Sequence, residues 1–237
     1  MLIPKALTRL SVAFCLLRVA TSQTVLKIMP LGDSITDITC WRAMLWQQLQ
    51  NAGVKNIDFV GSMVSAATCD GISNYDRNHE GHSGYLAVDI ANKNQLVGWL
   101  NSAKPDIVMF HLGTNDIGRS KTPAETIAAF TTLLDQMRAS KSSIKVIVAQ
   151  IIPLPWVDSG IRSLNSAIAS WATLKNTTSS PIYVVDQYTG FTTSDLQSDQ
   201  IHPNESGDKK ITARWYPTLL KVIQNSQAGK REAVFSA

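Results

Sequence analysis

Short apolar segments alternate with longer amphipathic segments along most of this chain. Several of the short segments are apolar at nearly every position, which is typical of strands buried on both faces of a parallel sheet. The longer segments repeat apolar residues every three or four positions, as an amphipathic helix does. The predicted strands cover residues 25–29, 57–60, 107–112, 144–152 and 182–185, and the predicted helices cover residues 41–52, 88–100, 122–140, 159–174 and 206–222. Five strands that are each followed by a helix predict an α/β fold, with a five-stranded parallel sheet wrapped by helices.

Two regions fall outside this alternation. A long polar segment follows the second predicted strand, and we expect a loop there up to about residue 83. Apolar periodicity is lost over about residues 224–237, where we expect a loose tail. The total length of 237 residues suits one α/β domain. We therefore predict a single domain over residues 23–237.

The first 22 residues have the pattern of a secretory signal peptide. Lys5 and Arg9 provide a positive start, residues 10–17 are mostly apolar, and small residues precede a cleavage site after Ser22. Arg18 departs from this pattern, and a buried first helix is the alternative interpretation. No other apolar stretch approaches the roughly 20 residues needed to span a bilayer. The pattern predicts a secreted, extracellular protein that is not inserted in a membrane.

The net charge changes with this interpretation of the N-terminus. The whole sequence holds 22 basic and 18 acidic side chains, a formal charge of +4. Cleavage after Ser22 removes three basic residues and no acidic ones, which leaves 19 against 18 and a charge of +1. A nearly neutral domain has little electrostatic attraction for a polyanion. We therefore expect no nucleic-acid partner.

The cysteine count changes in the same way. The chain has three cysteines, an odd number that suits a secreted protein poorly. Cleavage removes Cys15 and leaves Cys40, just after the first strand, and Cys69, in the long polar segment. Export favours a disulfide between these two, and two buried thiols are the alternative. We predict the disulfide.

Small and polar residues with reactive or hydrogen-bonding groups follow the predicted strands. Ligands of parallel α/β sheets bind beyond the carboxyl ends of the strands. Ser34 follows the first strand, Gly84 closes the loop after the second, and Asn115 follows the third. Asp199 and His202 follow the fifth. We therefore expect these five residues at one edge of the sheet.

Three of these residues are candidates for a catalytic triad. A serine hydroxyl becomes a strong nucleophile when a neighbouring histidine takes its proton, and the histidine needs an acidic partner that holds its ring. Ser34 lies on the exit from a strand, and Asp199 precedes His202 by three residues, so one turn can bring the acid and the base together. Attack on an ester also creates an oxyanion that needs hydrogen-bond donors. The backbone amides of Ser34 and Gly84 and the side-chain amide of Asn115 are candidate donors.

Each of these residues also has an ordinary structural interpretation. A serine or an Asp-x-x-His sequence after a strand is often only a cap or a turn. Asn115 is a common turn residue, and Gly84 suits a position with positive φ or close packing. We interpret Asp33 and Asp116, next to the candidate site, as structural hydrogen-bonding residues, and His111 as a satisfied core histidine.

Two further motifs resemble known patterns but have the wrong spacing. Residues 81–85 read GHSGY, and Tyr85 stands where a nucleophile elbow needs its second glycine. Residues 79–82 read HEGH, which is one residue shorter than the helical zinc motif and contains a glycine that disfavours a helix. No further ligand cluster accompanies these histidines. We therefore predict no metal site.

Four short blocks of sequence together resemble the SGNH, or GDSL, hydrolases. GDSIT surrounds Ser34, HEGHSG contains Gly84, GTND includes Asn115, and DQIHP runs from Asp199 to beyond His202. Each block is weak alone, but the four occur in the family's order over nearly the whole mature chain. The segments KIMPLGDSIT, IDFVGS and NHEGHSGY are similar in particular to family 3 carbohydrate esterases, which include acetyl xylan esterases.

This resemblance implies a three-layer, flavodoxin-like α/β/α fold and no organic cofactor. It implies that Ser34 is the nucleophile, His202 the base and Asp199 the acid that orients the base. It also implies an oxyanion hole made by the Ser34 and Gly84 amides and the Asn115 side chain. The expected protein is a secreted, monomeric serine esterase that hydrolyses acetyl esters on acetylated xylan. The alternatives are a lipase or lysophospholipase type of esterase acting on other acyl esters, and a non-catalytic carbohydrate-binding scaffold.

Two surface expectations remain. Asn176 begins an Asn-Thr-Thr sequence in a predicted loop, which matches the N-glycosylation signal. Trp41, Trp46 and Trp156 carry rings that could stack on sugars, but most tryptophans of such a domain serve packing. We therefore do not assign the tryptophans to the site.

Overall fold

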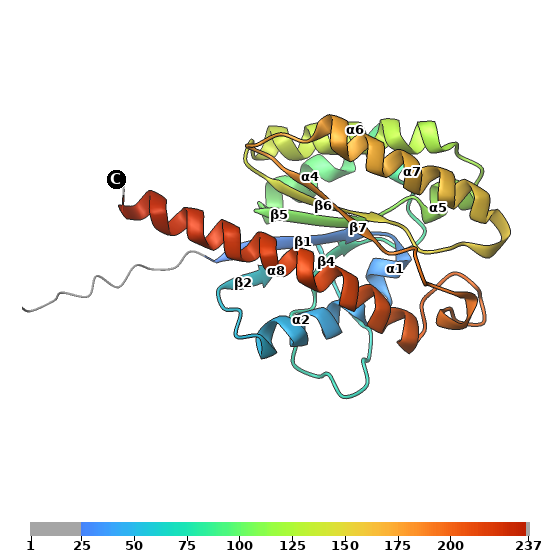
Figure 1. Ribbon diagram of the computed structural model, residues 1–237, viewed down its shortest axis with the longest axis horizontal. Helices are drawn as coiled ribbons and strands as arrows, with labels where there is room; N and C mark the ends of the chain where they lie inside the picture. The colour runs from blue at the N-terminus through green and yellow to red at the C-terminus, as the bar shows by residue number, and fades with distance from the viewer. Residues whose placement is uncertain (1–24, 236–237) are drawn as a thin grey trace, which may run out of the picture.

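Five parallel strands form the centre of the structure, a computed structural model that describes residues 25–235 (Figure 1). These strands are β1 (Leu26–Gly32), β2 (Ile57–Phe59), β5 (Ile107–His111), β6 (Lys145–Gln150) and β7 (Ile182–Asp186). They lie in the order β2-β1-β5-β6-β7, and each neighbouring pair is parallel. This is the strand order of a flavodoxin-like sheet. The predicted fold class is therefore confirmed, whereas the predicted signal peptide at residues 1–22 lies outside the described residues.

Two short strands inside the predicted loop extend this sheet. β4 (Asn78–Gly81) pairs in parallel with the last two residues of β1, and β3 (Met63–Val64) pairs antiparallel with β4. Because β2 pairs only with the first residues of β1, β4 occupies the part of the same side that β2 leaves free. The sequence pattern missed β4 because its residues are polar, although His79 and Glu80 are both fully buried.

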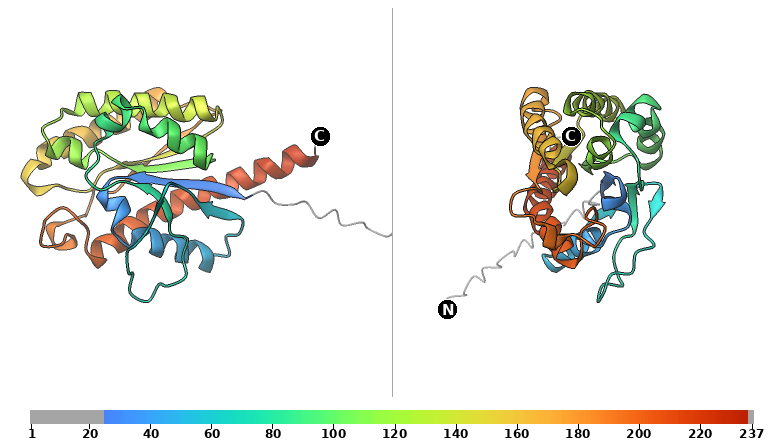
Figure 2. Two further views of the ribbon diagram at one scale, coloured as in Figure 1. Left: turned by 180° about the vertical axis from the view of Figure 1, so that it is seen from behind. Right: turned by 90° about the vertical axis from the view of Figure 1, so that its right-hand side faces the viewer.

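Helices cover both faces of the sheet, as Figures 1 and 2 show. The helices of one face are α2 (Trp41–Asn51) and α8 (Glu205–Phe235), and those of the other are α3 (Ala87–Asn92), α4 (Gln95–Ala103), α6 (Pro123–Ser140) and α7 (Asp158–Lys175). Four short helices lie in the segments that follow the strands: α1 (Ser34–Asp37), α5 (Thr114–Gly118), η1 (Pro155–Val157) and η2 (Thr193–Asp195). Within residues 25–235, every helix is too short or too polar to cross a lipid bilayer.

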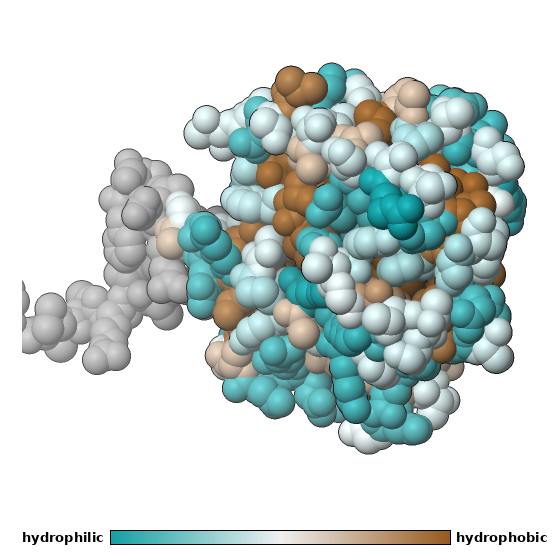
Figure 3. All heavy atoms as spheres, turned by 45° about the vertical axis from the view of Figure 1, so that its right-hand side comes forward, coloured by the Kyte–Doolittle hydropathy of each residue, from teal (hydrophilic) through white to brown (hydrophobic). Residues whose placement is uncertain are grey.

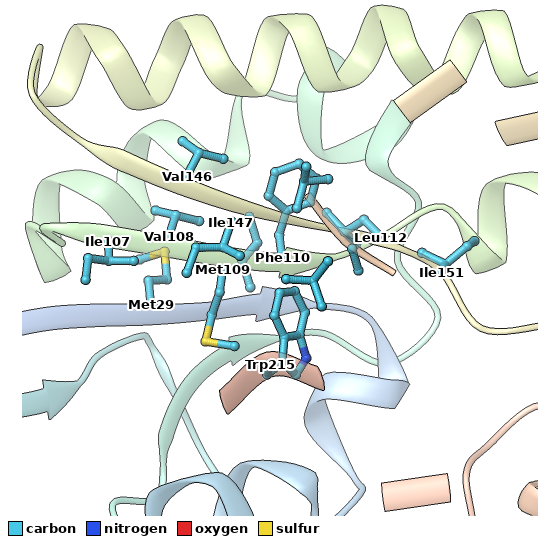
Figure 4. Packing of buried hydrophobic residues seen from close by; sticks show 14 of the residues in the cluster. Met29, Ile107, Val108, Met109, Phe110, Leu112, Val146, Ile147, Ile151 and Trp215 are labelled. Carbon is cyan, nitrogen blue, oxygen red and sulfur yellow. The ribbon is translucent and has the colours of Figure 1, made fainter. Parts of the chain in front are cut away.

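The apolar core lies against both faces of β5 (Figure 4). Every residue of this strand is at most 1% exposed. Phe110 packs edge-on against Phe130 of α6, with 5.0 Å between the ring centroids. Trp215 of α8 lies on the opposite face, next to Trp41 of α2. Burial on both faces explains the unbroken apolar pattern that predicted this strand.

The helix predicted over residues 88–100 is in fact two helices, α3 and α4. Asn94 lies between them with a φ of 50°, in the left-handed region. Asparagine tolerates this conformation better than most residues, and it interrupts the helical hydrogen bonds. The apolar spacing continues across the break, so periodicity alone could not reveal it.

The prediction of a loose tail over about residues 224–237 is wrong up to Phe235, because α8 continues that far. Residues just before and inside the predicted tail are buried, with Ile223 at 0% and Ser226 at 8% exposure. The Gln227 side chain donates a hydrogen bond to the carbonyl of Lys55, at 2.9 Å. Packing of the preceding turns thus extends a helix into a segment without apolar periodicity.

A disulfide joins Cys40 and Cys69, as predicted. Cys40 immediately precedes α2, and Cys69 lies in the loop between β3 and β4. The bridge therefore fastens this long loop to the segment that follows α1. The alternative of two buried thiols does not hold in the structure.

Candidate active site

Ser34 lies on a sharp turn between β1 and α1. Gly32 ends β1, and a Cβ atom there would lie 2.0 Å from the Thr36 hydroxyl oxygen and 2.9 Å from the His111 carbonyl, so no side chain fits. Asp33 caps α1, because its carboxylate accepts a hydrogen bond from the Ile35 N–H at 3.0 Å. The glycine and the cap together hold Ser34 at the first residue of the helix.

Three predicted residues form a continuous hydrogen-bonded chain. The Oγ of Ser34 lies 2.8 Å from Nε2 of His202. On the other side of the ring, Nδ1 of His202 lies 2.6 Å from Oδ2 of Asp199. Residues 168 positions apart in the sequence are thus in direct contact at the carboxyl edge of the sheet. This arrangement can transfer a proton from the serine hydroxyl to the imidazole.

The Asp199 carboxylate is held by its own loop. Its Oδ1 accepts hydrogen bonds from the backbone N–H groups of Ile201 at 2.9 Å and His202 at 3.0 Å. Burial raises the pKa of Asp199, but the hydrogen bonds from the His202 ring and these two N–H groups outweigh it and lower the pKa to about 2. Asp199 is therefore a carboxylate at neutral pH and can stabilise a protonated His202.

Gly84 and Asn115 lie on neighbouring segments that contact each other. Gly84 has a φ of +80°, which a residue with a side chain rarely adopts. The side-chain amide of Asn115, in α5, donates a hydrogen bond to the Tyr85 carbonyl at 3.1 Å. The Gly84 loop is joined to the Ser34 segment in turn, because the His82 N–H donates to the Gly32 carbonyl at 2.9 Å. All five predicted site residues therefore lie on connected segments at one edge.

The two aspartates next to the site have structural roles, as predicted. The Asp116 carboxylate accepts hydrogen bonds from the N–H groups of Ala87 at 2.9 Å and Val88 at 3.0 Å, and so caps the start of α3. Burial raises the pKa of Asp116. Burial also raises the pKa of Asp33 to about 7, and the nearby Asp116 charge adds to this effect.

His111 is a core histidine, as predicted, but only one of its ring nitrogens has a partner. It is 1% exposed, and its Nε2 accepts a hydrogen bond from the Ile152 N–H at 3.3 Å. Its buried Nδ1 has no hydrogen-bond partner within the described part of the chain. Burial lowers the pKa of His111 to about 4, so this ring is neutral at pH 7.

The HEGH motif makes contacts within the protein. Nδ1 of His79 accepts a hydrogen bond from the Gly81 N–H at 3.0 Å, and Glu80 lies 2.7 Å from Nε2 of His82. Among residues 25–235, no group of three or more His, Cys, Asp or Glu side chains is placed to hold a metal ion. The contact between Glu80 and His82 was not predicted from the sequence. The available signal was a spacing of two residues at the end of a strand, which puts both side chains on one side where the backbone stays extended.

The fold and the contacts of this site are those of a class of hydrolases with a serine, a histidine and an aspartate at the carboxyl edge of a flavodoxin-like sheet. The chain belongs to the GDSL-like lipase/acylhydrolase family, whose family profile matches residues 31–210. It is a carboxylic ester hydrolase similar to acetyl esterases.

Solved structures support this assignment. An acetyl esterase mutant crystallised with an acetate ion is 42% identical, covers 85% of this chain and 100% of its own, and superposes with a TM-score of 0.80. A family 3 carbohydrate esterase from Talaromyces cellulolyticus is also 42% identical, with coverage of 85% and 99% and a TM-score of 0.81. A Clostridium thermocellum family 3 carbohydrate esterase is 30% identical, with coverage of 86% and 100% and a TM-score of 0.75.

A curated relative, a multidomain esterase from Ruminococcus flavefaciens, is 28% identical over 88% of this chain. The chain spans only 30% of the length of that relative. The comparison therefore concerns one part of a larger protein.

Proposed function

We propose that this protein is a secreted serine esterase that removes acetyl groups from acetylated xylan. The observation that carries the proposal is the chain of contacts from Asp199 through His202 to Ser34, in which both distances are at most 2.8 Å. Secretion is part of the proposal because the sequence begins with a signal-peptide pattern and the domain contains a disulfide.

In the first step, Ser34 Oγ attacks the carbonyl carbon of the acetyl group while His202 Nε2 takes the hydroxyl proton. The resulting oxyanion is bound by the backbone N–H groups of Ser34 and Gly84 and by the side-chain amide of Asn115. As the bond to the sugar breaks, His202 returns the proton to the departing sugar oxygen.

In the second step, a water molecule attacks acetyl-Ser34 while His202 takes one of its protons. Acetic acid then leaves and ionises in solution, and His202 returns its proton to Ser34 Oγ. Asp199 holds the ring in the required tautomer and stabilises its positive charge in both steps. The low pKa of Asp199, about 2, keeps it ionised throughout.

The proposed substrate class rests on the relatives and on the surface near the site. The two relatives at 42% identity are an acetyl esterase and a carbohydrate esterase. The face shown in Figure 3, which includes the carboxyl edge, has polar residues around separate apolar patches. Exposed side chains at this edge include Tyr85 at 37% and Trp156 at 55%. A hydrophilic glycan with apolar sugar faces suits such a mixed surface.

The triad is tested with a Ser34→Ala variant. We expect its turnover of p-nitrophenyl acetate to fall by at least about 10³-fold with unchanged thermal stability, because the acyl-enzyme cannot form. A Ser163→Ala variant, which changes an exposed hydroxyl on α7 that bonds the Ser159 carbonyl, is the control and should retain activity. Wild-type activity in Ser34→Ala would show that another residue is the nucleophile.

The substrate is tested by comparing acetate release from acetylated xylan with hydrolysis of long-chain acyl esters by the wild-type protein. We expect release from xylan to be faster in kcat/KM. Equal or faster hydrolysis of long-chain esters would instead support the lipase alternative.

A further inference from the structure

A cluster of one buried carboxylate and three partly exposed rings lies next to Gly84, and the proposed mechanism does not use it. Its members are Glu80 at the end of β4, His82 and Tyr85 in the following turn, and Trp99 of α4. Glu80 is 0% exposed, yet its carboxylate accepts hydrogen bonds from the N–H of Ser62 at 2.7 Å and the Ser62 hydroxyl at 2.6 Å. Nε2 of His82 lies 2.7 Å from the same carboxylate. A buried carboxylate is tolerated only with such partners.

The His82 ring is held in one orientation. It stacks on Tyr85, with 4.8 Å between centroids and 22° between planes, and on Trp99, with 4.3 Å and 16°. With its edge bound to Glu80, the ring cannot rotate without losing one hydrogen bond and two stacking contacts. Glu80 thus fixes His82, and His82 fixes the Tyr85 side chain.

Two of the three predicted oxyanion donors, the Gly84 N–H and the Asn115 side-chain amide, depend on the turn at residues 82–85. Gly84 lies between His82 and Tyr85, in a turn closed by a hydrogen bond from the Tyr85 N–H to the His82 carbonyl at 3.1 Å. The Tyr85 carbonyl in turn accepts the hydrogen bond from Asn115 Nδ2 at 3.1 Å. A shift of the turn would therefore move the Gly84 N–H and the Asn115 amide together.

We propose that Glu80 and His82 are positioning residues for the oxyanion hole. Their contact sets the turn at residues 82–85, and the turn sets the Gly84 N–H and the Asn115 side chain for the oxyanion of the transition state. This gives the HEGH motif a role in the reaction without contact between Glu80 and the substrate. The inference rests on the proposed function, because it concerns the stabilisation of the intermediate formed by Ser34.

The first test uses Glu80→Gln, which keeps the shape of the side chain but removes its charge, and His82→Phe, which keeps a ring for stacking but loses Nε2. We expect both variants to lower kcat for p-nitrophenyl acetate by about 10- to 100-fold with KM changed less than threefold, because misplaced donors act mainly on the transition state. A wild-type kcat in folded Glu80→Gln or folded His82→Phe would overturn the proposal.

The second test combines Glu80→Gln with Asn115→Ala. Asn115→Ala alone should lower kcat by about 10²–10³-fold, as for loss of one oxyanion donor. If Glu80 acts through the oxyanion hole, adding Glu80→Gln to Asn115→Ala should lower kcat by a smaller factor than Glu80→Gln does in the wild-type protein, because only the Gly84 donor is then left to be displaced. A fully additive loss would show that Glu80 acts elsewhere and would overturn the proposal.

A matched control separates positioning from general destabilisation. Ser180→Ala removes a buried hydroxyl that donates to the Ile144 carbonyl at 2.7 Å, two residues before β7 and away from the site. It should lower the melting temperature without changing kcat at 20 °C. A fall in melting temperature without a fall in kcat in Glu80→Gln would make that residue structural only and overturn the proposal.

Failure of the proposed function gives a different result. A serine-directed phosphonate should label Ser34 completely in Glu80→Gln, only more slowly than in wild type. Absence of Ser34 labelling in the wild-type protein would count against the proposed nucleophile. Normal labelling rates in both proteins would count against the positioning role alone.

Discussion

Two strands that pair with opposite sides of β1 are buried for different reasons. β5 is apolar except for His111, and its side chains pack against helices on both faces of the sheet. β4 reads Asn-His-Glu-Gly, yet three of its four residues are buried. Burial of β5 contributes hydrophobic free energy, whereas burial of β4 is offset by the polar partners of the Glu80 carboxylate and by the one hydrogen bond that His79 accepts from Gly81. One strand stabilises the fold, and the other orders the loop that carries Gly84.

The contrast between β4 and β5 shows where such a domain can bury polar side chains without disrupting its apolar core. β4 lies on the sheet beside the carboxyl end of β1, next to Ser34. Hydrogen bonds of buried polar groups are directional, so they specify position more sharply than apolar contacts do. We therefore expect substitutions in β5 to change mainly stability and those near β4 to change mainly turnover.

The largest effect is expected from Phe110→Ala in β5. This ring is 1% exposed and packs against Phe130, so its removal leaves a cavity and should lower the free energy of unfolding by about 3–5 kcal/mol. Urea denaturation followed by circular dichroism measures this loss. Val64→Ala in β3, where the side chain is 66% exposed, should change stability by less than about 0.5 kcal/mol. If the folded Phe110→Ala protein lost turnover as strongly as Glu80→Gln, the view that β5 affects mainly stability and β4 mainly turnover would be wrong.

The same difference decides how much could be predicted from the sequence. β5 and its parallel neighbours were predictable because a short run of apolar residues indicates a strand that is buried on both faces. Ser34, Asn115 and His202 were predictable as a group because each follows a strand, and strand ends of a parallel sheet meet at one edge. β4 was not predictable from hydropathy, because its burial depends on Ser62 and on the His82 turn. The continuation of α8 past residue 223 was missed for a related reason, since contacts such as that of Gln227 with Lys55 have no apolar period.

A smaller effect is expected from Asp33, which follows β1 next to Ser34. Its titration should make the stability of the folded protein depend on pH. Burial raises the pKa of Asp33 to about 7, above its ordinary value of 3.8. Between these two values the folded protein holds a proton that the unfolded chain releases, so stability should fall as pH rises from about 4 to above 7. The free energy of unfolding should fall by at most about 4 kcal/mol, which is the difference between the two pKa values converted to free energy.

Melting temperatures of wild type and Asp33→Asn at pH 4.5 and pH 8 measure this dependence. Asparagine does not titrate, so the variant should gain stability relative to wild type at pH 8 compared with pH 4.5. Asp70→Asn, on an exposed loop, is the control and should shift the melting temperature by the same amount at pH 4.5 and pH 8. If the difference in melting temperature between pH 8 and pH 4.5 were the same in the wild type and in Asp33→Asn, the raised pKa of Asp33 would be contradicted.

The smallest effect on stability comes from a pair of glycines with nearly the same backbone. Gly84 has a φ of +80° and Gly71, in the loop between β3 and β4, has a φ of +73°. A Cβ at Gly71 would meet no atom within 4 Å. A Cβ at Gly84 would meet only the Arg119 guanidinium, in ordinary van der Waals contact at 3.5 Å. Substitution by alanine should therefore cost each about 1–2 kcal/mol through backbone strain alone. Turnover should separate them, because only Gly84→Ala moves an N–H group that we propose binds the oxyanion. We expect kcat to fall at least about tenfold in Gly84→Ala and to stay at the wild-type value in Gly71→Ala, and equal kcat values would remove Gly84 from the oxyanion hole.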